Sequence, residues 1–155
     1  MKHRNYLAVI TLSLLLAFGA TVAAAGEFTE ADAKKLAIEG VALIEKVGLE
    51  KAHGIFHDPD GGFRKGELYV FVLDMQGTWL VYPPRPKGEG NTIANVKDAD
   101  GKYVVMEMIK VAMEKGEGWV NYRWMHPQTN KVTPKVSYVK RVGDTEMFAG
   151  VGIYK

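Results

Sequence analysis

The sequence predicts an α+β domain built around a five-stranded antiparallel sheet. Along the chain, the patterns run in the order helix, two strands, helix, three strands. Residues 67–74 and 78–82 are rich in β-branched and aromatic residues, and only three residues separate them, which is typical of a hairpin. We therefore expect a long N-terminal helix on one face of the sheet and a crossing segment with the second helix on the other.

The first 25 residues have the three-part pattern of an export signal. Lys2 and Arg4 precede an apolar run over 6–18, and small residues follow over 20–25. This run is short for a membrane span, which needs ~20 apolar residues. We expect cleavage near Ala25, which leaves residues 26–155 as one periplasmic or secreted domain. The alternative is an uncleaved membrane anchor.

Composition restricts the chemistry of residues 26–155. Two of the chain's 20 basic residues and none of its 18 acidic residues lie in 1–25, so the remainder carries no formal net charge. Such a domain has no overall attraction for nucleic acid, and we predict no nucleic-acid partner. The absence of cysteine excludes disulfides and thiolate chemistry.

An amphipathic helix is predicted over residues 27–49. Thr29 with Asp32 fits an N-terminal cap, because the threonine hydroxyl can accept from free backbone amides. Apolar residues then recur at steps of three and four, which places them on one stripe. The stripe consists of Ala33, Leu36, Ala37, Gly40, Leu43, Ile44 and Val47. Residues 48–66, rich in Gly and Asp, are predicted to be a connection with turns.

The remaining elements follow from turn signals and periodicity. Pro83 and Pro84 end the hairpin because proline has no amide to pair. Residues 87–100 are predicted to be an irregular crossing segment, and 103–115 a helix that Gly116 ends. Strands are predicted over 118–125, 134–142 and 146–154.

A pocket for a small anion is predicted beside the last three strands. Side chains alternate along a strand, so Tyr122 and Trp124 share one face. Lys135 in the next strand needs an anionic partner if it is buried, and a ligand carboxylate can supply it. The alternative is a surface lysine with an exposed head group. We expect Tyr82 and Tyr138 to complete the aromatic walls.

Arg85 follows the two prolines and could clamp a carboxylate with two parallel donors. Tyr69 is expected to pack in the core, and His126 to lie at the rim of the pocket. Ser137 has no nucleophile motif around it, so we predict no enzymatic activity. The runs DPDGG and DADGK are predicted to be turns rather than calcium loops.

His53 and His57 are four residues apart, a spacing that could hold a metal or a haem iron on one helical face. Gly54 lies between them, Asp58-Pro59 follows, and the neighbouring sequence offers no evident third ligand. We therefore expect neither a metal nor another cofactor, and a metal- or haem-binding protein remains the weakest of three alternatives.

Five motifs together resemble the single Cache domain family. They are LYVFVLDMQGTWLVYPPRPKGEGNT, KDADGK, GEGWVNYRWMHP, PKVSYVKR and AGVGIY. The resemblance implies a PAS-like fold outside the cytoplasmic membrane that senses small molecules, often short carboxylates. It also implies pocket positions at Tyr122 and Lys135 and pairing of two copies through the N-terminal helix.

Such domains usually lie between two membrane helices and feed a receptor or kinase module, whereas this sequence ends soon after its last strand. We therefore expect a free-standing sensor-type domain that binds a small organic carboxylate and reports to a membrane receptor or kinase. The alternative is an accessory module that docks on a membrane kinase or redox complex without a small ligand.

Overall fold

The computed structural model describes residues 28–155, so the predicted export signal lies outside the described residues. None of the helices within 28–155 is long and apolar enough to cross a membrane. The elements are α1 (Glu30–Val47), α2 (Leu49–His57), β1 (Arg64–Lys65), β2 (Leu68–Asp74), β3 (Trp79–Val81), the 3-10 helix η1 (Pro86–Gly88), α3 (Val104–Lys115), β4 (Glu117–Met125), β5 (Val132–Arg141) and β6 (Met147–Tyr154).

The strands form one antiparallel sheet. Its order is β1-β2-β6-β5-β4. β3 pairs with the part of β2 that β1 does not cover, on the edge opposite β6. The five predicted strands and the α+β fold class are confirmed. The sheet has a sixth strand, β1, which the sequence analysis did not predict because it contains only two residues.

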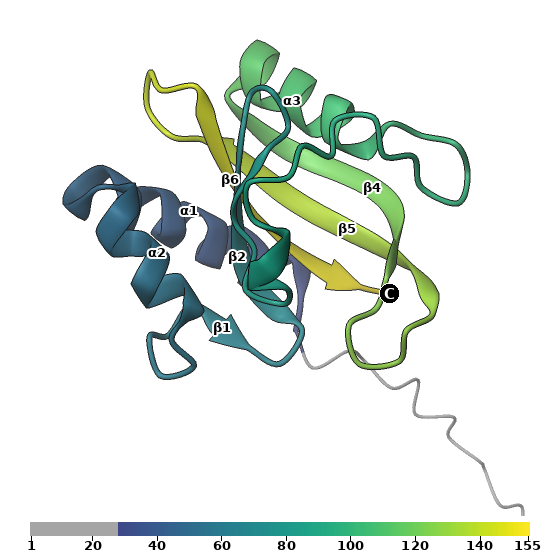
Figure 1. Ribbon diagram of the computed structural model, residues 1–155, viewed down its shortest axis with the longest axis horizontal. Helices are drawn as coiled ribbons and strands as arrows, with labels where there is room; N and C mark the ends of the chain where they lie inside the picture. The colour runs from purple at the N-terminus through teal and green to yellow at the C-terminus, as the bar shows by residue number, and fades with distance from the viewer. Residues whose placement is uncertain (1–27) are drawn as a thin grey trace, which may run out of the picture.

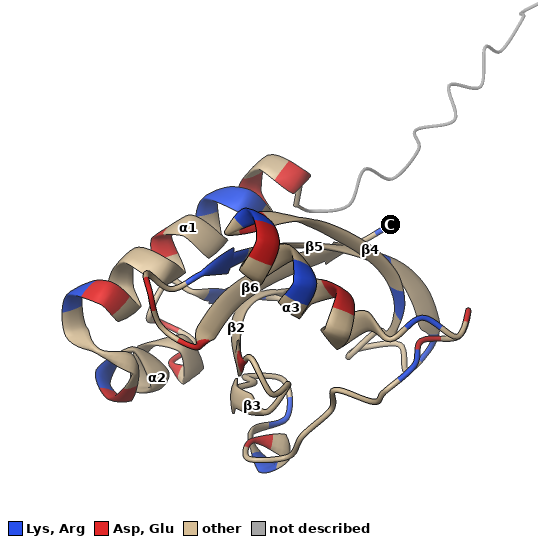
Figure 2. Ribbon diagram, turned by 90° about the horizontal axis from the view of Figure 1, so that it is seen from above, with Lys and Arg blue, Asp and Glu red and all other residues tan. Residues whose placement is uncertain are grey.

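Helices cover both faces of the sheet. Figure 1 shows α1 and α2 on one side, and α3 with the crossing segment on the other. Each side has its own hydrophobic cluster: one forms between the sheet and α1 with α2, and the other between the sheet and α3. Lys, Arg, Asp and Glu are interspersed along α1 and α3, as Figure 2 shows. The predicted layering is confirmed.

The N-terminal helix begins at the predicted cap. The Thr29 hydroxyl accepts from the Asp32 amide, and the Asp32 carboxylate accepts from the Thr29 amide, so the capping box is complete. The helix ends at Val47 because Gly48 adopts a positive φ of 81°.

The predicted connection over 48–66 is wrong in its first part, because the chain resumes a helix at Leu49. Ala52 and Phe56 lie one turn apart on α2 and are fully buried against α1 and the sheet. This burial stabilises the helix despite Gly54. One consequence is that His53 and His57 lie on the same side of a regular helix.

Candidate functional site

A small cavity lies between the sheet and α3. Its volume is about 20 Å³, which is room for about one water molecule. The lining is aromatic and aliphatic, with one charged side chain, Lys135. The lining residues are Tyr69, Phe71, Trp79, Tyr82, Ile93, Val104, Val105, Met108, Tyr122, Trp124 and Lys135.

Strand register places Lys135 at the centre of a row of polar groups. It pairs with Tyr122 on β4 and with Tyr154 on β6. Residues directly opposite in adjacent antiparallel strands point to the same face, so all three side chains lie on the α3 side of the sheet. This row is the polar part of an otherwise apolar site.

Lys135 is almost completely buried, with 2% of its surface exposed. Its Nζ donates to the hydroxyl of Tyr69 at 3.0 Å and of Tyr154 at 3.4 Å. Among residues 28–155, no carboxylate lies within ion-pair distance of this nitrogen. The described residues therefore surround the amine with phenol groups and place no counter-charge in contact with it.

Burial lowers the pKa of Lys135 from its ordinary 10.5 to about 7, although the charge of Glu67 acts to raise it. The same Nζ lies 4.7 Å and 4.4 Å from the ring centroids of Tyr69 and Tyr154, where the aromatic faces attract a cation. The charge of Glu67 offsets only part of the desolvation. At neutral pH the amine is close to the midpoint of its titration.

The tyrosines around the amine remain protonated. Burial raises the pKa values of Tyr69, Tyr122 and Tyr154 well above the ordinary 10.0. Tyr122 Oη lies 2.9 Å from the hydroxyl of Ser137, which is fully buried. Each phenol therefore keeps its O–H. That of Tyr154 donates to the Met125 carbonyl, so Tyr69 and Tyr122 are the phenols that can donate to an anion.

A glycine on β6 provides the space for the Lys135 side chain. A Cβ at Gly152 would clash with Ser137 Oγ and would lie 2.6 Å from Lys135 Cε. Gly152 pairs with Ser137 in the sheet, directly beneath the lysine stem. The alternating glycines of the AGVGIY motif thus leave room on the cavity side of the strand.

Four side chains separate the cavity from the surface. Trp79, Tyr82, Ile93 and Trp124 line both the inner cavity and an outer groove of about 240 Å³. Trp79 and Tyr82 stack with ring centroids 4.2 Å apart and an interplanar angle of 8°. A second outer groove of about 550 Å³ also borders Trp79, Tyr82 and Ile93. We call the four residues shared by the cavity and the first groove, Trp79, Tyr82, Ile93 and Trp124, the wall.

Comparison with known proteins places this architecture in a family. Residues 61–155, more than half of the chain, match a family model described as the Cache domain. The chain belongs to the Cache domain family. The resemblance predicted from the five motifs is confirmed.

Two curated relatives match this Cache domain over 86 residues, 56% of the chain. One is the methyl-accepting chemotaxis protein McpP of Pseudomonas putida, at 29% identity, and the other is the sensor histidine kinase MctS of Rhizobium johnstonii, at 31%. The match spans only 16% and 18% of their respective lengths. It is thus a similarity to one part of each receptor.

A solved structure has the same fold over most of the Cache domain. Its subject is described as carboxylic acid recognition by a Cache chemosensory domain, and it is 27% identical with a TM-score of 0.63. The match covers 78% of this chain and 84% of that chain.

Four of the six predicted site residues meet at the cavity of this Cache domain, namely Tyr82, Tyr122, Trp124 and Lys135. Their roles in binding stay a prediction. Tyr69, predicted to pack in the core, also lines the cavity and hydrogen-bonds to Lys135. Arg85 is exposed and borders only the two outer grooves.

Tyr138 does not lie with these residues. It is three positions from Lys135 on β5 and points to the opposite face, where it packs against Trp119 with ring centroids 5.0 Å apart. There, burial and the neighbouring Glu117 raise its pKa to about 12. The prediction that Tyr138 forms a wall of the pocket is wrong, because side chains alternate along β5 and Tyr138 points away from the cavity.

His126 does not line the cavity or the outer grooves, but it contacts Tyr154, which accepts from Lys135. Its Nε2 is 3.1 Å from Glu67 Oε2, and its ring centroid is 4.4 Å from that of Tyr154. Tyr154, which the sequence analysis did not identify, donates to the Met125 carbonyl at 2.9 Å. These contacts hold one of the two phenol groups that accept from Lys135.

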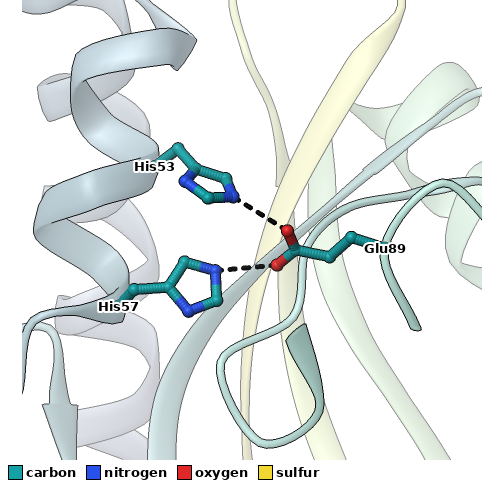
Figure 3. A group of neighbouring side chains, drawn as sticks. All are labelled: His53, His57 and Glu89. Atoms are coloured by element: carbon teal, nitrogen blue, oxygen red, sulfur yellow. Dashed lines mark hydrogen bonds and ion pairs between the residues drawn. The ribbon is translucent and has the colours of Figure 1, made fainter. Parts of the chain in front are cut away.

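A second cluster of polar side chains lies outside the cavity of the Cache domain. The Nε2 atoms of His53 and His57 point at the two carboxylate oxygens of Glu89 (Figure 3). Sequence reasoning identified the two histidines but missed Glu89, which is more than thirty residues away in the chain. These three groups have the chemistry to hold a metal ion.

Proposed function

We propose that this Cache domain is an extracytoplasmic, non-enzymatic sensor domain that binds a small organic carboxylate beside Lys135. The observation that carries the proposal is the buried amine with no carboxylate of the described chain in contact with it. An isolated buried ammonium is costly, and an anion from outside restores the missing counter-charge. The similarity to a Cache chemosensory domain described for carboxylic acid recognition supports the same chemistry.

The site offers a carboxylate one cation and several neutral donors. Lys135 provides the charge, while Tyr69 and Tyr122 supply O–H groups, which they keep because burial raises their pKa values. Charge-assisted hydrogen bonds of this kind are stronger than neutral ones. The aromatic and aliphatic lining favours a short apolar remainder, as in acetate, propionate, lactate or pyruvate.

Binding requires the wall to move. A volume of about 20 Å³ has room for one water molecule, so even a two-carbon acid needs more space. Tyr82 and Trp124 border both the cavity and an outer groove, so their rings can swing outward into that groove. We infer that ligand binding shifts the segment after β3, which carries Tyr82, and that this shift is the signal.

The recipient of the signal in this proposal is a membrane receptor or kinase. Its basis is that the relatives include a chemotaxis protein and a sensor kinase. Pairing of two copies through α1 stays a prediction from the family resemblance.

Calorimetric titration of the purified protein with acetate, propionate, lactate and pyruvate tests the proposal. We expect at least one acid to bind with one site per chain, and its uncharged amide analogue not to bind. If the folded protein binds none of these acids, the proposed ligand class is wrong, and the docking-module alternative gains support.

Affinity for the acid should depend on pH in a defined window. Anion binding needs the charged amine, whose pKa in the free protein is about 7. Below this value the affinity should be constant as long as the acid itself stays ionised, and above it the affinity should fall by about tenfold per pH unit. Dissociation constants measured at pH 6, 7, 8 and 9 check this. A constant value from pH 7 to 9 would show that Lys135 does not supply the charge.

A further inference from the structure

We propose that His53, His57 and Glu89 form a binding site for a divalent transition-metal ion, with Zn²⁺ as the ion that fits them best. His53 Nε2 lies 2.8 Å from Glu89 Oε2, and His57 Nε2 lies 2.7 Å from Glu89 Oε1. One ligand atom from each residue lies within 4.8 Å of the others. All three side chains converge on one point, as Figure 3 shows.

The helix fixes the two histidines in a geometry suited to a metal. They are four positions apart on α2, and the buried Ala52 and Phe56 hold the other face of this helix against the core. Their ring centroids are 4.5 Å apart. Two imidazoles presented from consecutive turns of a helix are the arrangement found in helical zinc sites.

The donor set selects the class of ion. Two imidazole nitrogens and one carboxylate are typical of zinc sites that keep a further position for water. Imidazole also suits copper and nickel, whereas calcium and magnesium prefer oxygen ligands. With ligands at the usual zinc distances, the nitrogen–oxygen separations would open to roughly 3.4 Å. Small side-chain rotations provide this change.

The site is accessible and joined to the ligand-binding region. The His53 side chain is 42% exposed, so an ion can enter directly from solvent. Glu89 Oε1 also accepts from the Tyr82 backbone amide at 2.6 Å. A metal bound to Glu89 would thus be linked, through this carboxylate, to the backbone amide of the wall residue Tyr82.

The structure answers all three arguments that the sequence gave against a metal. The segment around Gly54 is helical, the helix ends after His57 and so before Pro59, and the third ligand comes from the loop after η1. A second histidine–carboxylate pair, His126 with Glu67, provides a matched comparison. Its histidine makes the same kind of hydrogen bond, but no other histidine of residues 28–155 joins it, so the pair lacks the metal donor set.

The test is titration of the untagged protein, treated with a chelator and then dialysed, with Zn²⁺ by calorimetry and with Co²⁺ by visible absorption. The variants are His53→Gln, His57→Gln and Glu89→Gln, with His126→Gln as the control. The Glu89→Gln side chain can still accept from the Tyr82 amide, which preserves the loop while weakening the ligand. Circular dichroism verifies that each variant is folded.

We expect one Zn²⁺ per chain in the wild type and in His126→Gln. Each of the three site variants should bind more weakly by at least ~10-fold, since loss of an outer-shell partner alone costs 10–100-fold. Co²⁺ should give absorption bands that His57→Gln removes. Absence of Zn²⁺ binding, or equal affinity in the wild type and all variants, would overturn the proposal. Neither result bears on the carboxylate site, which the acid titrations test separately.

Discussion

Replacing Lys135 by methionine is expected to abolish carboxylate binding and, at the same time, to stabilise the protein. Methionine has a similar length and no charge, so it fills the space without requiring a counter-ion. A pKa of about 7 in place of 10.5 shows that the fold disfavours the charged amine. Converted to free energy, the whole pKa shift corresponds to about 5 kcal/mol of stability that is lost when Lys135 is charged. The lost hydrogen bonds to Tyr69 and Tyr154 reduce the net gain to on the order of 3 kcal/mol.

The pH dependence of this gain has a definite sign. The folded protein has the lower lysine pKa, so the unfolded chain binds more protons between pH 7 and 10.5. Wild-type stability therefore rises with pH across this window. The Lys135→Met variant lacks the rise, and its advantage is largest below pH 7.

Urea unfolding at pH 6.5 and 9 measures the stability difference, and calorimetry with the acid that binds the wild type measures the loss of affinity. Lys140→Met is the matched control, because Lys140 lies on the same strand, is partly exposed and pairs with Glu117 at 2.6 Å. It should bind the acid normally. If the Lys135→Met protein binds the acid as tightly as the wild type does, Lys135 does not contribute to binding.

Replacing Gly152 by alanine is expected to impair both folding and binding. The added methyl would clash with Ser137 Oγ and would lie 2.6 Å from Lys135 Cε, so both side chains must shift. Overpacking of this kind costs roughly 1 to 3 kcal/mol. The displaced amine should also lose its position relative to the phenol groups. We expect acid affinity to fall by at least ~10-fold, because 1.4 kcal/mol already corresponds to that factor.

Gly118→Ala is the control for the stability effect. A Cβ at Gly118 would lie 2.9 Å from Val111 Cγ1, a crowded contact that does not involve the cavity. Both variants should unfold at lower urea concentration than the wild type, and only Gly152→Ala should bind the acid more weakly. Equal acid affinities in the two variants would show that the space beneath Lys135 is not needed for binding.

The fold was largely predictable because its signals are local. Hairpin turns, strand alternation and the Thr29 capping box each involve a few neighbouring residues, and all three appear in the structure. α2 was missed because Gly54 and the Asp-Gly turns weakened the helical pattern. Its i, i+4 pair, Ala52 and Phe56, was the available signal, and both side chains are buried.

The candidate site was predictable only in part, because it depends on register. Tyr122 and Lys135 follow from chemistry and alternation, but Tyr154 joins them only through the pairing of β5 with β6. The error in placing Tyr138 could have been avoided, since residues three apart on a strand point to opposite faces. Glu89 had no local signal, because its partners lie on a helix that the crossing segment approaches only in the folded chain.

The proposed function depends on Lys135 being a buried amine whose anionic partner comes from outside the chain. Heteronuclear NMR titration of the lysine side-chain signals, assigned with the Lys135→Met variant, measures this amine directly. We predict a pKa of about 7 in the free protein, which rises when the bound acid is added. A lysine that titrates near 10.5 and does not respond to any of the acids would contradict the account.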